Sequence, residues 1–150
     1  MTISSEEKLI NLLKLTGTSE MGHSGGSLTD HLLRTYWLLK KLGADENTCL
    51  VGGLHSVYGT NFYTAECLDK TESTLVADTF GEEIDRLVKL FSSLSRPDEI
   101  ETNTRGMSDN DYQIMQIVEI ANLLDQGGIE EEDNPNLLAF YKETFNEGVK

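Results

Sequence analysis

Several features are scarce or missing in this chain of 150 residues, and each absence narrows the class of protein. The two cysteines, Cys49 and Cys67, form no CxxC pair and give no disulfide framework. No apolar run is long enough to cross a bilayer. The opening MTISSEEKLI lacks the basic start and apolar core of a secretory signal. These absences predict a protein of the reducing cytoplasm with no membrane partner.

Basic residues are also few. The chain has 12 lysines and arginines against 26 acidic residues, and its formal net charge is -14. Nucleic-acid binding depends on lysine and arginine placed against phosphates. An acidic surface repels polyanions over about 8 Å at physiological salt. We therefore expect no nucleic-acid partner, whereas a small phosphorylated ligand in a local pocket is compatible with this charge.

What the sequence does contain is helical spacing of apolar residues. With 38% hydrophobic and 25% charged residues, the composition is that of a globular protein, and the length fits one domain, residues 1–150. There is no internal repeat, no β alternation and no long linker. We predict a single all-α domain, a bundle of six or seven helices. The expected helices cover residues 5–16, 31–43, 47–59, 71–80, 82–96, 111–126 and 135–145, with a loop at 98–110.

Residues with special backbone preferences mark the expected helix ends. Thr29 or Asp30 is the expected N-cap of the second helix, and Gly43 is its expected C-cap. Asn134 is the expected N-cap of the last helix. The pair Gly52-Gly53 inside the third helix costs up to roughly 1 kcal/mol per glycine. Two glycines there indicate close approach by a neighbouring backbone.

Polar residues on otherwise apolar helices form the candidate site. His31 and His55 lie on successive helices joined by a short turn, so we expect the two side chains to face each other. Glu119, Asn122 and Gln126 are spaced i, i+3 and i+7 and share one face of a later helix. That face should be core, where polar side chains are unusual. We therefore expect both histidines to lie near Asn122.

Three segments in this order resemble the HD-domain superfamily of metal-dependent phosphohydrolases. They are SGGSLTDHLLRTYWLLKKLGADENTCLVGGLHSVYGT, TFGEEIDRLVKLFSSLSR and IVEIANLLDQ. That superfamily places a histidine on one helix, a His-Asp pair on the next and an aspartate on a later helix. The likeness is closest to the domain that removes pyrophosphate from guanosine tetraphosphate (ppGpp), and it extends to small HD-like proteins with the same serine and asparagine. It covers roughly residues 20–128.

The chain departs from this pattern at its carboxylates. The resemblance implies that His31 and His55 match the two histidine ligands. Ser56 stands in place of the first aspartate and Asn122 in place of the second. Gly59-Thr60 stand where the ppGpp hydrolases have a Glu-Asp pair. Four carboxylates are therefore missing, and we expect no appreciable ppGpp hydrolysis.

The missing carboxylates weaken the case for a metal. Each lost carboxylate removes an attraction of roughly a few kcal/mol for a divalent cation at partly buried distances. A hydroxyl and an amide bind hard cations weakly and do not suit zinc. We expect manganese, iron or zinc to bind weakly or not at all at His31, His55 and Asn122. Glu119 or His23 is the nearest substitute ligand.

Each candidate residue also has a structural interpretation. A histidine on an apolar helix is more often a hydrogen-bonded core residue than a ligand. Ser56 as a nucleophile needs a base other than His55, because adjacent helical residues point about 100° apart. Tyr58 is more often a packing residue than a catalytic acid. Asn122 and Gln126 can satisfy each other.

The sequence supports three functional hypotheses. The first is a divergent HD-type enzyme acting on a small metabolite, with His31, His55, Ser56 and Tyr58 as catalytic residues. Its substrate would be bound by His23, Glu119 and Asn122. The second is a catalytically inactive HD-like module that binds a ligand or regulates. The third is a metal-independent enzyme that transfers protons through its histidines and Tyr58. In each case the expected partner is a small-molecule ligand.

Overall fold

The computed structural model describes residues 4–16, 22–23, 26–59, 68 and 73–146, and only the backbone of Gly22, His23, Gly26 and Asn146. Its helices are α1 (Ser5–Thr16), α2 (Leu28–Leu42), α3 (Glu46–Leu54), α4 (Leu75–Phe80), α5 (Glu82–Ser93), α6 (Asp98–Glu101), α7 (Asp109–Asp125) and α8 (Pro135–Tyr141), and a π-helical turn at Lys142–Asn146 follows. A short antiparallel pair, β1 (Gly22–His23) and β2 (Gly26–Ser27), precedes α2. The predicted single all-α domain is confirmed. Within the described residues there are eight α-helices rather than six or seven, because α6 forms in the expected loop.

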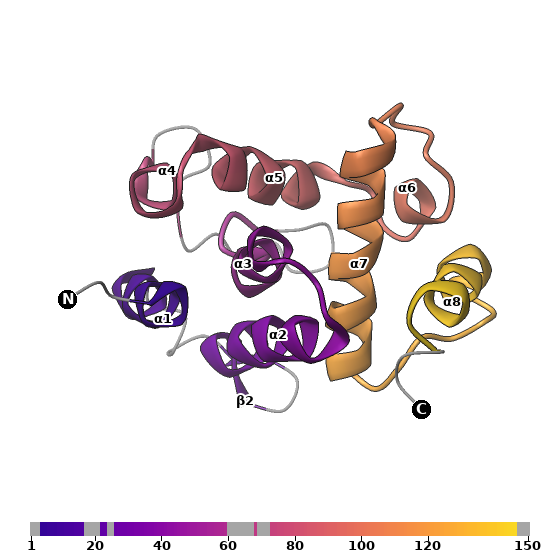
Figure 1. Cartoon of the computed structure of the whole chain (residues 1–150), viewed down its shortest axis with the longest axis horizontal. Helices are drawn as coiled ribbons and strands as arrows, with labels where there is room; N and C mark the ends of the chain where they lie inside the picture. The colour runs from indigo at the N-terminus through magenta and orange to yellow at the C-terminus, as the bar shows by residue number, and fades with distance from the viewer. Residues whose placement is uncertain (1–3, 17–21, 24–25, 60–67, 69–72, 147–150) are drawn as a thin grey trace.

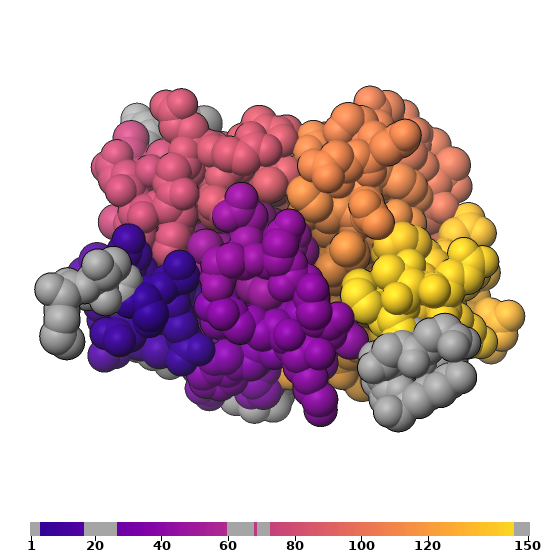
Figure 2. Space-filling model, in the orientation of Figure 1, coloured from indigo at the N-terminus to yellow at the C-terminus, as the bar shows by residue number. Residues whose placement is uncertain are grey.

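α7 organises the bundle. Figure 1 shows it running across the ends of α2 and α5, with α1 and α8 on opposite sides of the molecule. In Figure 2 the atoms of α2 and α3 lie between those of α1 and those of α8 on one face. Apolar side chains from several of these helices are fully buried, among them Leu9, Leu32, Leu54 and Phe91. No helix in the described ranges is long and apolar enough to cross a membrane.

The start of α2 differs from the sequence prediction. Its N-cap is Ser27, not Thr29 or Asp30. The Ser27 hydroxyl accepts from the Asp30 backbone N–H at 3.1 Å, while the Asp30 carboxylate accepts from the Ser27 N–H at 3.3 Å. This reciprocal pair is a capping box, and it begins the helix one turn ahead of His31. At the other end Gly43 is the C-cap, as predicted, with a left-handed φ of 90°.

The two glycines of α3 mark a close approach, as their position in the sequence indicated. A Cβ on Gly52 would overlap Leu39 Cδ1 of α2, and a Cβ on Gly53 would lie 2.6 Å from Leu9 Cδ2 of α1. The contact is made by neighbouring side chains rather than by a neighbouring backbone. α3 ends at Leu54, earlier than expected, and His55 is its C-cap.

The start of α8 is held by a residue of α6. Asn134 precedes α8, but its side chain makes no capping hydrogen bond. Instead the Glu101 carboxylate accepts from the backbone N–H groups of Asn136 and Leu137, at 2.8 and 2.9 Å. A negative charge at a helix N-terminus also interacts favourably with the helix dipole. Asn134 is therefore the N-cap residue, as predicted, but a carboxylate distant in sequence supplies the capping hydrogen bonds.

Candidate functional site

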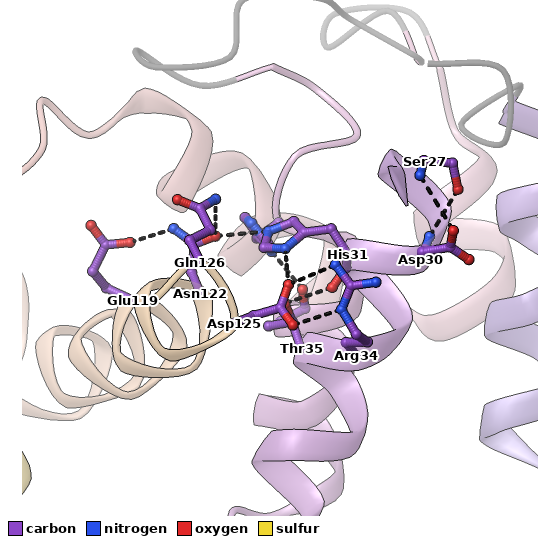
Figure 3. A network of polar contacts seen from close by, with 11 residues as sticks. Ser27, Asp30, His31, Arg34, Thr35, Glu119, Asn122, Asp125 and Gln126 are labelled. Atoms are coloured by element: carbon purple, nitrogen blue, oxygen red, sulfur yellow. Dashed lines mark hydrogen bonds and ion pairs between the residues drawn. The ribbon is translucent and has the colours of Figure 1, made fainter. Parts of the chain in front are cut away.

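The ring of His31 lies at the centre of a polar network that joins α2 to α7 (Figure 3). Its Nδ1 lies 2.6 Å from Asp125 Oδ2, and its Nε2 lies 2.8 Å from Asn122 Oδ1. The amide nitrogen of Asn122 donates to Glu119, which orients the amide oxygen toward His31. Both ring nitrogens of His31 therefore face acceptors.

Asp125 is shared between His31 and Arg34. The Arg34 guanidinium donates from Nε to Asp125 Oδ1 at 2.7 Å and from Nη2 to Oδ2 at 3.1 Å. Such two-pronged pairs are among the stronger hydrogen bonds in proteins. Burial raises the pKa of Asp125, but hydrogen bonds from Arg34 and His31 outweigh it and hold the pKa below its ordinary value. Asp125 is therefore an ionised carboxylate clamped between two residues of α2.

Glu119 extends the network toward the end of α5. Its Oε1 accepts from Asn122 Nδ2 at 2.9 Å and from Arg96 Nη1 at 2.5 Å. Glu119 and Arg96 are only 2% and 6% exposed. Burial raises the pKa of Glu119, although Arg96 and Asn122 act in the opposite direction. At the other end of the face, Gln126 Nε2 donates to Asn122 Oδ1 at 3.3 Å. The predicted polar face of α7 is thus one connected chain of contacts.

His55 completes the cluster from the end of α3. Its ring packs edge-on against that of His31, with centroids 5.2 Å apart and an interplanar angle of 81°. Its Nδ1 lies 2.6 Å from the Gly52 carbonyl oxygen. A carbonyl only accepts, so Nδ1 carries the hydrogen and Nε2 has the lone pair. Burial, together with the neighbouring His31, lowers the pKa of His55 well below its ordinary 6.5. His55 is therefore a neutral imidazole at neutral pH.

The remaining predicted site residues do not all join this cluster. Ser56 is buried in the turn after α3. Tyr58 donates its hydroxyl to Asp85 Oδ1 of α5 at 2.5 Å, and burial and this contact raise the pKa of the phenol. Its hydroxyl therefore contacts α5 rather than the histidine rings. The backbone of His23 lies in β1, but its side chain, like Thr60, falls outside the described residues.

The cluster is poorly arranged for acid–base catalysis. A general base works best when its pKa lies near the operating pH. The lowered pKa of His55 makes it a weak base. Both ring nitrogens of His31 are already hydrogen-bonded. The arrangement instead provides guanidinium groups and hydrogen-bond acceptors that are held in fixed positions by one another.

A divalent metal ion, which the HD resemblance implies, does not fit these side chains. A ring nitrogen that carries a hydrogen cannot ligate a metal, and both nitrogens of His31 face acceptors. The carboxylates of Asp125 and Glu119 are held by the guanidinium groups of Arg34 and Arg96, which would repel a second cation. Across the described ranges, no three histidine, cysteine or acidic side chains are grouped to hold an ion.

Three residues of the network were missed by sequence reasoning. Two of them had a usable signal, because Arg34 follows His31 by three positions and Asp125 follows Asn122 by three. Each therefore shares a helix face with a predicted residue. Arg96 stands between α5 and α6, where no helical spacing links it to the site. Its role emerges only from the fold.

Part of the chain matches a known protein family. Residues 12–96 match a family described as Domain of unknown function (DUF6817). No curated protein and no solved structure matches the chain. The matched segment includes His31, His55 and Arg96, whereas the residues of α7 that bind them lie beyond it. Because the match covers more than half of the 150 residues, the chain belongs to the DUF6817 family.

Proposed function

We propose that this protein is an HD-like ligand-binding or regulatory module that works without a metal ion. The observation that carries the proposal is the position of His31. Its ring nitrogens are both held, by Asp125 and by Asn122, where the resemblance implies a metal ligand. Hydrogen bonds to Asp125 and Asn122 hold α2 against α7, and edge-on ring packing places His55 beside them.

The chemistry of the cluster favours binding over turnover. The neutral, weakly basic His55 and the fully engaged His31 leave no strong base for a nucleophile such as Ser56. Tyr58 directs its hydroxyl to Asp85. The divergent-enzyme hypothesis therefore has less support from the geometry than the binding hypothesis does.

The class of ligand follows from the charges at the edge of the cluster. The Arg34 side chain is 36% exposed and that of Asp125 10% exposed, and Gln126 is also exposed. A partly exposed guanidinium at this edge is notable in a chain with a formal net charge of -14. Guanidinium groups pair well with phosphate and carboxylate. The expected ligand is a small anionic metabolite that contacts Arg34 and Gln126.

The experiment is a thermal-shift screen of small phosphorylated and carboxylated metabolites in the presence of EDTA. We expect at least one compound to raise the Tm, and expect the shift to be lost in Arg34→Gln. The matched control is Arg86→Gln, because Arg86 also makes two-pronged bonds to carboxylate, in its case to Glu83 and Asp111, but lies outside the cluster. A screen in which no compound raises the Tm would refute the binding proposal. A Tm shift seen only in a parallel screen without EDTA would also refute it, because the proposed module works without a metal ion.

A further inference from the structure

Arg96 is an unusually buried arginine. Its side chain is 4% exposed, and its Nη1 lies 2.5 Å from Glu119 Oε1. The guanidinium carbon lies 4.7 Å from the ring centroid of Phe91, a cation–π distance. Arginine is almost never this buried unless it is paired. The groups that contact Arg96, a carboxylate and an aromatic face, therefore both favour a positive charge.

The groups around Arg96 are those of the histidine cluster. The Phe91 ring that packs on the guanidinium also packs on His55, with centroids 5.4 Å apart. The positive charge of Arg96 is one cause of the lowered pKa of His55, after burial and His31. Glu119, which binds Arg96, also accepts from Asn122. The guanidinium thus contacts a carboxylate and an aromatic ring, and these two groups in turn contact the Asn122 amide and the His55 imidazole.

We infer that Glu119 and the face of Phe91, backed by Asn122 and His55, form a cation site, and that the guanidinium of Arg96 is its resident occupant. The inference builds on the metal-free module proposed above, but it does not depend on any external ligand. A guanidinium stays charged at every pH a protein experiences. It therefore neutralises Glu119 permanently and keeps other cations out of the cluster.

The inference predicts what removal of the side chain would leave. In Arg96→Ala a buried carboxylate would lose its partner, and such a loss is strongly destabilising. The vacated space would be lined by the Glu119 carboxylate and the face of Phe91, beside His55. Small cations should then enter the site and restore stability.

The test measures the Tm of Arg96→Ala with and without millimolar methylguanidinium chloride, and separately with MnCl₂ or ZnCl₂. At about 100-fold excess over its dissociation constant, a bound cation should raise the Tm by about 5 °C or more. The wild type should show no such shift. Arg86→Ala is the matched control, because Arg86 binds two carboxylates but its side chain is 49% exposed. The double variant Arg96→Ala/Glu119→Gln should lose the response.

Each outcome decides the inference. If Arg96→Ala is unfolded alone, recovery of its helical circular dichroism by methylguanidinium supports the resident-cation role. A variant that no cation stabilises or refolds would overturn the inference, and so would an equal response in Arg86→Ala. Failure of the metabolite screen would leave this result unaffected, because the cation test uses no metabolite. The two proposals can therefore fail independently.

Discussion

The imidazole Nδ1 of His31 and the carboxylate Oδ2 of Asp125 lie 2.6 Å apart, although the two residues are separated by 94 positions in the chain. The same carboxylate binds Arg34, one helical turn further along α2. A single side chain of α7 therefore fixes both the position and the rotation of α2. It also places the His31 ring edge-on to His55.

The first prediction concerns this carboxylate. Asp125→Asn should lower the free energy of unfolding by about 2–3 kcal/mol, because it removes the negative charge that two donors share in a mostly buried place. Urea denaturation measures the change. The control is Asp111→Asn, which also breaks a two-pronged bond to an arginine, in this case Arg86. The Arg86 side chain is half exposed and keeps its bond to Glu83. That control should lose less than about 1 kcal/mol, and equal losses would contradict the central role of Asp125.

The second prediction concerns acid. The folded protein holds His55 neutral, with its pKa well below 6.5, whereas the unfolded chain takes up a proton near 6.5. The stability that depends on neutral His55 is therefore present above pH 6.5 and is lost as the pH falls below that value toward the folded-state pKa. The slope approaches about 1.4 kcal/mol per pH unit.

His55→Gln is the control for acid sensitivity. It removes the titrating ring and leaves in place His31 and Arg96, which act on the pKa of His55, and Glu119, which binds Arg96. The difference between the two pH profiles therefore isolates His55 from Glu119, whose raised pKa acts in the opposite direction. If the stability of the wild type and of His55→Gln changed equally with pH below 6.5, His55 would take up its proton in the folded protein as it does in the unfolded chain, and the prediction would fail.

The third prediction concerns the glycine of α3 that faces α2. Alanine is favoured over glycine in a helix by about 1 kcal/mol. At Gly52, however, a Cβ would overlap the buried Leu39 side chain and lie 3.3 Å from Thr35 Cγ2. Overpacking costs about 1–3 kcal/mol, so Gly52→Ala should be destabilising on balance. In a Leu39→Ala background the same change should be neutral or stabilising, and a cost that persists there would argue against the overlap.

The fourth prediction concerns hydrolysis and metal. The purified protein should not hydrolyse ppGpp with manganese, because His31 is engaged and Gly59 offers no carboxylate to orient a water. Calorimetric titration should show weak or no manganese binding. Ser56→Asp combined with Asn122→Asp should raise manganese affinity, since it adds two carboxylates near the histidines. Turnover by the wild type that His55→Ala abolishes would overturn this prediction.

The helices were predictable because their apolar spacing and their end residues agree. Gly43 ends α2 as the sequence indicated. The meeting of the two histidines with Asn122 was also predictable, because the turn between α2 and α3 is short and the polar face of α7 has helical spacing. Helix ends and helical spacing depend on residues close together in the chain, so they can be read from the sequence.

The charged partners were not predictable in the same way. Asp125, Arg34 and Arg96 are residue types that usually lie in solvent, and only the helix-face spacing of Asp125 and Arg34 links any of them to the site. Arg96 in particular reaches Glu119 only because α5 and α7 come together in the fold. Which two residues form a buried ion pair depends on how the helices pack, and helical spacing within one segment does not predict that packing. For the same reason Glu101 could not be identified as the cap of α8.

The long reach of the His31 contacts has a consequence for synthesis of the chain on the ribosome. When the segment up to residue 96 has emerged, α2 and α3 can pair. Asn122 and Asp125, which accept the hydrogen bonds of His31, have not yet emerged at that point. A buried imidazole without partners opposes stable packing. The nascent chain should therefore stay loosely packed until α7 emerges, and a ribosome-bound chain stalled before α7 should be digested by protease much faster than the complete protein.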